Sequence, residues 1–363
     1  MKMTILHTET LKRWGGQQNR ILSEAVGLNK RGHHAVIACH RGSMLARKSK
    51  EAGVKVYEVK MVKQAHLQTI PKLIKIIRDE VVDIVSTHSS VDSWAGGLAA
   101  RLTGRRLVRF RHNLYPIGRD PLTKFIYAMP NRFIAISNAV KDVLTGGGLS
   151  SSKISVVPSS VNTERFSPDA GDIRKELDLP ADAVVIGNTA TFTQIKGYEY
   201  LLQAFSIIGK RYPAYLLFAG EIEERFKESK IFSHVDRSLR DKVLLLGGRE
   251  DVPRVLNTID IFVYPSFLEG LGTALLEAMI MARPVVVSDI PTFREFIEDD
   301  VNGLFFEAKN PDDLAKKVMS LLENKISRTL LGKNARSTAL ERFTVGDMID
   351  LTEAQYKEVI NAK

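Results

Sequence analysis

The sequence has 363 residues, of which 44% are hydrophobic and 26% are charged. This size and composition predict a globular protein of about two domains, and no apolar run reaches the ~18–20 residues of a membrane-spanning helix. The formal net charge is +10, and residues 1–165 hold 27 Lys and Arg against 11 Asp and Glu. We expect this basic half to meet an anionic membrane or a phosphorylated glycan; a solubilising surface is the plain alternative.

The N-terminus and the single cysteine bear on location. Residues 3–6 read directly as a strand, without the pattern of a signal peptide. Cys39 is the single cysteine, so an intrachain disulfide is excluded, and its apolar run indicates a core residue. We therefore expect a cytoplasmic protein that makes peripheral contact with the inner face of the membrane.

Apolar runs alternate with amphipathic stretches along the whole chain. In the first half the expected strands are 4–7, 34–39, 55–59, 83–87, 107–111, 133–137 and 154–158, and the expected helices are 17–31, 67–80, 92–103, 121–130 and 138–145. In the second half the expected strands are 184–187, 215–219, 243–246, 261–264, 285–288 and 303–306, and the expected helices are 197–210, 222–229, 251–258, 273–281, 291–298 and 311–323.

Strands that alternate with helices favour parallel pairing in a doubly wound sheet. We predict an α/β fold with two Rossmann-like domains, residues 1–166 and 167–344, which face each other across a cleft. The final helix, 345–363, has no sheet of its own, so we expect it to cross back to the first domain.

Ligands of such domains bind at the carboxyl ends of strands. The candidates that follow expected strands are Gly15-Gly16, His88, His112, Asn138 and Lys196. Each has an ordinary alternative, because a Gly-Gly pair can be a tight turn, a strand-end histidine can be a loop residue, and a lone lysine can be a surface group.

One segment of the second half combines several signals. Pro265-Ser266 follows an expected strand and leads into Glu269-Gly270-Leu271-Gly272-Thr273-Ala274-Leu275-Leu276-Glu277. Its glycines allow close backbone approach, and a helix beginning near Thr273 offers free amides and a partial positive charge. A phosphate needs amides and sugar hydroxyls need carboxylates. The segment therefore predicts a nucleotide-sugar site; two solvated glutamates are the alternative.

Other chemistries lack their motifs in this sequence. It has no cysteine cluster and no His-x3-His, which argues against a resident metal. It also has neither a GxSxG elbow nor a Walker-type loop. We expect no nucleic-acid partner, because no aromatic residues interleave with the basic ones.

Together these residues resemble the retaining glycosyltransferases of family 4, which have the GT-B fold. Besides the segment above, the resemblance rests on Gly15-Gly16, Lys196-Gly197 and Val157-Pro158-Ser159-Ser160-Val161-Asn162. It also includes Gly247-Gly248-Arg249-Glu250-Asp251-Val252 and the ending Arg342-Phe343. The stretch from His88 to Asn113 is similar to a bacterial subgroup linked to surface polysaccharide and lipopolysaccharide assembly.

The resemblance implies roles for individual residues. Glu277 would hold the ribose hydroxyls and Glu269 the hydroxyls of the donor sugar, while His112 would touch that sugar. Arg249 and Glu250 would lie along the base. The diphosphate would contact Gly16, whose turn includes Gly15, together with Lys196 and the backbone amides of Gly270, Leu271, Gly272, Thr273 and Ala274. The remaining candidates, on the acceptor side, are Arg13, His88, Arg109, Arg111 and Asn138.

One position departs from the family pattern. The family commonly has an arginine a few residues before the lysine, and Thr191 lies near that place here. Arg13, Arg249 or Arg294 could supply the missing charge. Loss of one charge-assisted contact would cost ~1.5–3 kcal/mol of transition-state binding.

The implied activity is that of a metal-independent, cofactor-free hexosyltransferase (EC 2.4). It would move a sugar from a nucleotide-diphosphate sugar to a glycan or lipid-linked acceptor. A nucleotide-sugar 2-epimerase and a non-catalytic, anionic-glycan-binding protein are the alternatives.

Overall fold

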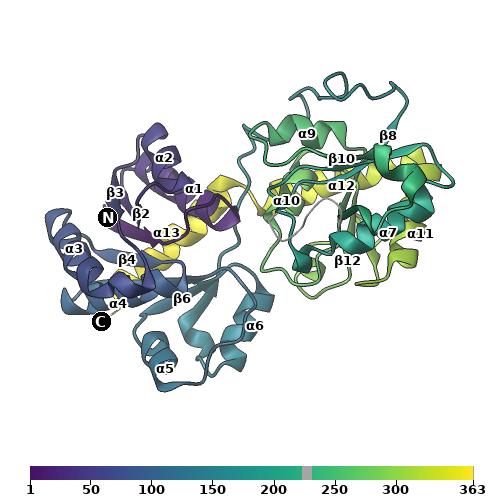
Figure 1. Cartoon of the computed structure of the whole chain (residues 1–363). Coiled ribbons are helices and arrows are strands. Elements are labelled where there is room, and N and C mark those ends of the chain that lie inside the picture. Colours follow the sequence, from purple (N-terminus) through teal and green to yellow (C-terminus); the bar gives the residue numbers. More distant parts are fainter. Residues whose placement is uncertain (223–230, 363) are drawn as a thin grey trace. The chain divides into compact units, whose positions relative to one another are not determined.

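The computed structural model describes residues 1–222 and 231–362 (Figure 1). The chain divides into two compact units, Met1–Ser160 with Val345–Lys363, and Val161–Thr344. The boundary expected after residue 166 therefore lies a few residues earlier. The backbone N–H of Val161 donates to the carbonyl of Phe343, and Phe166 is buried, so the connecting segment packs with the second unit.

The first unit is built on a parallel sheet with the strand order β3-β2-β1-β4-β5-β6-β7. Its strands are β1 (Thr4–Glu9), β2 (His34–His40), β3 (Val56–Val59), β4 (Ile84–Thr87), β5 (Arg106–Arg111), β6 (Arg132–Ala135) and β7 (Ile154–Val156). Its helices are α1 (Gly16–Lys30), α2 (Met44–Glu51), α3 (His66–Asp79), α4 (Ser90–Leu102), α5 (Pro121–Ala128), α6 (Asn138–Gly146) and α13 (Val345–Asn361), with 3₁₀ turns at Lys63–Ala65 and Ser151–Lys153.

The last helix packs into the core of this first unit, as the sequence predicts. Met348, Ile349, Tyr356 and Val359 of α13 are buried against α1 and the sheet, and α13 runs beside α1 in Figure 1. A Cβ atom on Gly27 of α1 would lie 2.6 Å from Cγ1 of Ile349. Glycine at this position therefore lets the two helices approach closely.

Replacing Ile349 by alanine should lower the free energy of unfolding by about 2–5 kcal/mol, because the side chain is 2% exposed and its removal leaves a cavity. Leu351→Ala, on the same helix but 45% exposed, is the matched control and should change it by less than about 0.5 kcal/mol. Chemical denaturation measures both. Equal effects would contradict the packing of α13 into this core.

The second unit is built on a parallel sheet with the order β10-β9-β8-β11-β12-β13. Its strands are β8 (Val184–Asn188), β9 (Ala214–Phe218), β10 (Val243–Leu245), β11 (Ile261–Tyr264), β12 (Val285–Ser288) and β13 (Leu304–Phe306). Its helices are α7 (Tyr198–Ile208), α9 (Val252–Thr258), α10 (Thr273–Ile280), α11 (Pro311–Glu323) and α12 (Lys325–Arg342), with 3₁₀ turns at Gln194–Lys196, Arg237–Lys242 and Phe293–Glu295.

The structure differs from the expected elements in three places. The expectation of a helix over 291–298 was wrong, because only the 3₁₀ turn Phe293–Glu295 forms there. Helices α2 and α12 were not expected from the pattern. The helix expected over 222–229 falls almost wholly outside the described residues. Each expected strand has its counterpart, with ends that shift by one or two residues.

Two features are absent from the described residues. Within residues 1–222 and 231–362 no helix is both long enough and apolar enough to cross a bilayer. The same part of the chain contains no group of three or more His, Cys, Asp or Glu side chains with metal-binding geometry.

Candidate active site

The glycine-bearing segment of the second unit forms an open helix N-terminus. Strand β11 ends at Tyr264, and α10 begins at Thr273 after Gly272, whose φ of +90° is left-handed. No side chain caps the first turn of α10. The backbone N–H groups of Thr273 and Ala274, its first two residues, are therefore open to a ligand at the positive end of the helix dipole. This arrangement suits an anion.

Three side chains converge beside this helix: Lys196, Tyr264 and Glu269, hereafter the Lys196 cluster. The Nζ of Lys196 forms an ion pair with Oε1 of Glu269 and lies 3.0 Å from the Tyr264 hydroxyl. That hydroxyl donates to the same glutamate oxygen at 2.9 Å. A cation and a carboxylate are thus held together, the first suited to a phosphate and the second to hydroxyl groups.

Backbone contacts fix the two loops that carry the cluster. The hydroxyl of Ser266 and the N–H of Phe267 both donate to the carbonyl of Ile195, at 3.0 and 3.1 Å. Gly197 has a φ of +67°, and a Cβ atom there would lie 2.1 Å from the carbonyl oxygen of Pro265. Only glycine fits, so the Lys196-Gly197 pair is required for the loops to touch.

Glu277 is the fifth of the eight residues of α10 and is half-buried. Desolvation raises the pKa of its carboxyl to about 7, and the guanidinium of Arg165 opposes that shift. Arg165 also donates to the carbonyl of Glu250 at 2.7 Å. Glu277, Arg165 and Glu250 therefore lie in one neighbourhood, as expected if the 248–250 turn and Glu277 serve the same nucleoside.

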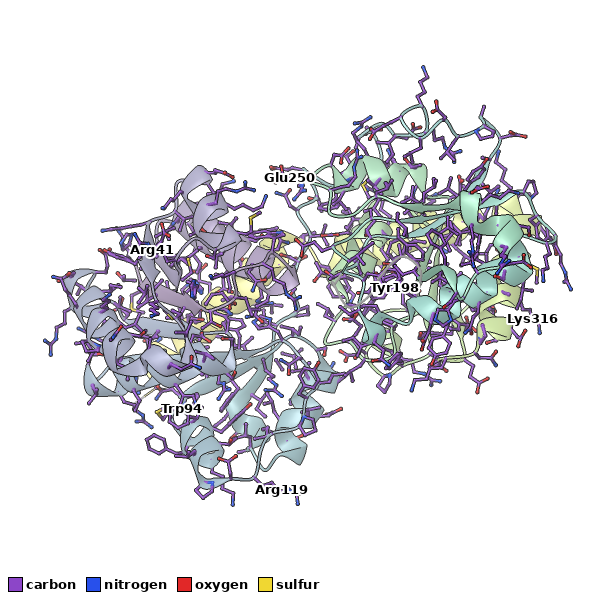
Figure 2. The ribbon with its side chains drawn as sticks, in the orientation of Figure 1. Arg41, Trp94, Arg119, Tyr198, Glu250 and Lys316 are labelled. Carbon is purple, nitrogen blue, oxygen red and sulfur yellow. The ribbon has the colours of Figure 1, made fainter. Side chains whose placement is uncertain are left out.

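The three substitutes for the arginine missing near Thr191 stay predictions. Arg249 forms ion pairs with Glu176 and Asp251, and Arg294 forms an ion pair with Asp289. Arg13 is exposed in the first unit. Thr191 itself is half-buried, and its carbonyl lies 3.3 Å from the hydroxyl of Tyr198, which Figure 2 shows inside the second unit.

In the first unit, the Gly15-Gly16 turn opens α1. Gly15 is extended and no side chain caps the helix. The buried Glu9 accepts hydrogen bonds from the N–H groups of Thr10 and Leu11 and from the side chain of Gln17, and so braces the turn. Burial and the nearby carboxylate of Asp92 raise the pKa of Glu9 to about 7.

Three histidines lie side by side: His7 within β1, His88 just after β4 and His112 just after β5, hereafter the histidine row. The Nδ1 of His7 lies 3.2 Å from Nε2 of His88, and Nδ1 of His88 lies 3.1 Å from Nε2 of His112. His7 and His88 are buried and His112 is half-buried. Burial lowers the pKa of each ring, to about 3 for His7 and His112. All three are neutral at pH 7.

The expected acceptor-side residues differ in exposure, and their role stays a prediction. Arg109 is 5% exposed and stacks 4.0 Å from the Tyr127 ring, and the buried His88 lies with Nδ1 3.1 Å from Nε2 of His112. Arg111 is anchored by the Tyr127 hydroxyl at 2.8 Å. Asn138 is exposed at the start of α6.

Sequence reasoning missed Tyr264, Arg165 and His7. Two of them carried a usable signal: Tyr264 ends a strand directly before the glycine-bearing segment, and His7 ends the strand expected over 4–7. Arg165 carried none, because its approach to Glu277 depends on the path of the connecting segment.

Two family models match the chain. Residues 14–165 match the model described as "Glycosyltransferase Family 4", and residues 169–338 match "Glycosyl transferases group 1". A curated relative is the UDP-Gal:alpha-D-GlcNAc-diphosphoundecaprenol alpha-1,3-galactosyltransferase of Escherichia coli, 26% identical over 81% of this chain and 80% of the relative. Another is an N,N'-diacetylbacillosaminyl-diphospho-undecaprenol alpha-1,3-N-acetylgalactosaminyltransferase of Campylobacter jejuni, 28% identical over 64% of this chain and 62% of the relative.

Solved structures share the fold. A glycosyltransferase from Rickettsia africae superimposes with a TM-score of 0.89 at 23% identity over 100% of both chains. Anabaena HepE in complex with UDP and glucose gives a TM-score of 0.87 at 18% identity, over 98% of this chain and 99% of that one.

Proposed function

Because this chain belongs to the family 4 glycosyltransferases, we propose that it transfers a hexose from a nucleoside diphosphate sugar to a lipid-linked glycan during cell-surface polysaccharide assembly. The observation that carries this proposal is the Lys196 cluster beside the open N-terminus of α10. It offers a cation and amides to a diphosphate, and a carboxylate to sugar hydroxyls. The named activities of the relatives support the lipid-linked acceptor.

The proposed mechanism is a front-face displacement with retention. The bond between the anomeric carbon and the diphosphate oxygen breaks, and the acceptor oxygen bonds to that carbon on the same face. The acceptor's proton passes to the departing diphosphate oxygen. Lys196 and the α10 amides stabilise the charge that develops there, while Glu269, bound to Lys196 and Tyr264, orients the sugar. No metal takes part in this proposal.

Incubation with a panel of nucleotide sugars tests the activity. Slow release of free sugar with the donor's anomeric configuration, followed by ¹H NMR, is the expected result. A C2-inverted nucleotide sugar would instead identify the 2-epimerase, and no reaction with any donor would favour the non-catalytic binding protein. Turnover should survive excess EDTA; loss of activity that Mg²⁺ restores would contradict metal independence.

We propose uridine as the donor base, because the Escherichia coli relative is named for UDP-Gal. A ligand that binds only the folded state raises the thermal midpoint in proportion to its occupancy. UDP should therefore shift the midpoint more than GDP or ADP at equal concentration. A larger shift with GDP or ADP would reassign the base.

The raised pKa of Glu277 predicts a pH-dependent affinity. The ionised carboxylate accepts hydrogen bonds from ribose hydroxyls, and its pKa of about 7 leaves it mostly protonated at low pH. Affinity for a UDP-hexose should fall about tenfold from pH 8 to pH 6. The intact sugar nucleotide is the right ligand, since it lacks the phosphate monoester that titrates near pH ~6.

The control for this titration is Glu277→Gln. At pH 8 the variant should bind the UDP-hexose more weakly than the wild type does, and its affinity should stay nearly constant between pH 8 and pH 6. Isothermal titration calorimetry measures both proteins. An identical pH profile in the two would show that another group titrates.

We also propose that the first unit rests on an anionic membrane through the α5 patch, which comprises residues 114–125. Its apolar side chains Tyr115, Leu122 and Phe125 are 56%, 66% and 51% exposed. Arg119 and Lys124 are exposed among them, and Figure 2 shows Arg119 at the edge of this unit. Apolar and basic groups together suit the interface of an anionic bilayer.

Co-sedimentation with vesicles tests the α5 patch. Binding to vesicles rich in phosphatidylglycerol, but not to phosphatidylcholine vesicles, is expected, and Leu122→Ser with Phe125→Ser should reduce it. The matched control is Ile326→Ser with Leu330→Ser, which removes exposed apolar groups from α12 of the other unit. Equal loss in both double variants, or none in either, would refute the patch.

A further inference from the structure

Only two proton arrangements of the histidine row make both of its ring-to-ring contacts hydrogen bonds. The Ser86 hydroxyl, 3.2 Å from Nε2 of His88, can accept from that nitrogen or donate to it and so fits either arrangement. A neutral imidazole carries one N–H donor and one lone pair. Each contact in the row joins an Nδ1 to an Nε2, so one atom of each pair must donate. Either all three rings carry the proton on Nε2, or all three carry it on Nδ1. Any mixture leaves two N–H groups or two lone pairs facing each other.

The row follows from the strand pattern. His7 lies two residues after Ile5, His112 two after Phe110 and His88 two after Ser86, so each ring lies on the sheet face that α1 and α13 cover. Strands β1, β4 and β5 are neighbours. The ring of Phe110 stacks on both His88 and His112, at 4.7 and 5.9 Å between centroids, which keeps the rings parallel.

A buried carboxylate stands at the inner end of the row. Nε2 of His7 has no hydrogen-bond partner among the described residues, and Oε1 of Glu24 lies 3.8 Å from it. The Tyr356 hydroxyl donates to the same oxygen at 2.5 Å. Arg20, whose Nε lies 3.6 Å from Oε2 of Glu24, is 1% exposed.

The pairing with Arg20 favours the ionised form of Glu24. Burial raises the pKa of the Glu24 carboxyl above its usual value, and Arg20 and the Tyr356 hydroxyl oppose that rise. An arginine side chain does not lose its proton in proteins, and a buried guanidinium requires a counterion. Glu24 is the carboxylate paired with Arg20 in the described structure. Its negative charge attracts an N–H, and not a lone pair, at Nε2 of His7.

We propose that Glu24, acting through His7 and His88, fixes the proton of His112 on Nε2 and leaves Nδ1 of His112 as a hydrogen-bond acceptor for the substrate. Nδ1 of His112 has no partner in the described part of the chain, and the ring is half-exposed. Resting on the proposed function, the group that meets this nitrogen is a sugar hydroxyl, which donates to it. Glu24, His7 and His88 are positioning residues, and His112 alone touches the substrate.

The consequence is a rule of specificity. An acceptor-only nitrogen binds a hydroxyl or an amide N–H, but it repels a group that has lone pairs and no hydrogen. A donor sugar whose hydroxyl at this point is replaced by fluorine or methoxy should therefore react poorly.

Long-range ¹H–¹⁵N spectra of histidine-labelled protein test the inference directly, since the two ring nitrogens have different shifts in each tautomer. In the wild type, His7, His88 and His112 should all show a protonated Nε2. A protonated Nδ1 on His112 would overturn the proposal. This readout needs no turnover, so it stands or falls separately from the transferase activity.

Variants of Glu24 and His7, at the inner end of the row, supply the second test. Glu24→Gln and His7→Phe should both abolish the single tautomer of His112, while His40→Phe, outside the row, should leave it unchanged. An unchanged His112 pattern in a folded Glu24→Gln or His7→Phe protein would overturn the selection. Where either variant does not fold, the wild-type spectrum decides.

Kinetics separate positioning from packing. His7→Phe should lower kcat about tenfold, as loss of an orienting partner does, with the donor KM nearly unchanged. In a His112→Ala background the same substitution should have less than about a twofold effect, because the group that it positions is gone. Equal, additive losses in the two backgrounds would assign His7 to packing and overturn the proposal.

Discussion

Replacing Lys196 by methionine is expected to lower kcat by about 10²–10³, with the fold intact. The reason is that Nζ, held by Glu269 and Tyr264, is the cation assigned to the departing diphosphate, and loss of one preorganised stabilising group costs about that factor. Methionine keeps the length of the side chain without its charge. Steady-state transfer, with the thermal midpoint measured in parallel, gives the result.

The matched control is Lys210→Met, which removes a cation from the exposed ion pair with Asp236 in the same unit. It should leave kcat within about twofold, since exposed pairs contribute little. Removing the partner as well distinguishes the two roles of Lys196. If Lys196 served only to neutralise Glu269, the double variant Lys196→Met with Glu269→Gln would be faster than Lys196→Met; we expect it to be at least as slow, because Glu269 orients the sugar.

The second large effect is expected at His112. His112→Ala should slow transfer by at least about a hundredfold and leave a slow residual rate, while the free energy of unfolding changes little because the ring is half-buried. The ring contacts the donor sugar in our assignment, so the donor KM should change less than kcat does. Initial-rate kinetics and denaturation curves on the same preparation measure both.

His40→Ala is the control for this variant. His40 ends β2, is half-buried like His112 and bonds through Nδ1 to the carbonyl of Arg41, but it is not part of the row. Its substitution should leave turnover near the wild-type value. Near-normal turnover in both His112→Ala and Glu277→Ala would show that the active site has been placed on the wrong residues.

The strands were predictable because parallel strands are buried on both faces. Runs such as Ile261–Tyr264 and residues 285–287 are buried and apolar and stop at turn residues. A strand can be recognised from that pattern without knowing which strands lie beside it. The same reasoning found α13, whose amphipathic stretch must cover a core, and its packing with α1 confirms the prediction.

Three helical elements depended on context. In α12 the buried positions are Leu331, Gly332, Ala335 and Ala339, mostly small residues that leave a faint apolar stripe. Gly332 shows why they are small: a Cβ atom there would lie 2.3 Å from the carbonyl of Ala282. Helix α2 has only eight residues, four of them charged, and is capped by Ser43, so it is too short for its pattern to stand out.

The 3₁₀ turn at Phe293–Glu295 mimicked a helix in the sequence. Phe293 and Phe296 are both buried and their rings meet edge to face at 6.2 Å. A spacing of three residues fits either helix type. The side chain of Thr292 donates to the carbonyl of Glu269 at 2.7 Å, which ties this turn to the glycine-bearing loop and not to a longer helix.

By itself, the sequence determined the two-domain α/β fold, the open N-terminus of α10 and the identity of Lys196, Glu269 and His112 as candidates, because these follow from local residue patterns. The cleft between the units stays a prediction. Only the tertiary structure decided which side chains meet. Lys196 follows β8 and Glu269 follows β11, which are neighbours in the sheet, and His7, His88 and His112 meet because β1, β4 and β5 are adjacent. Parallel pairing joins strands that are far apart in the chain, so the order of strands creates these contacts and no local pattern encodes them.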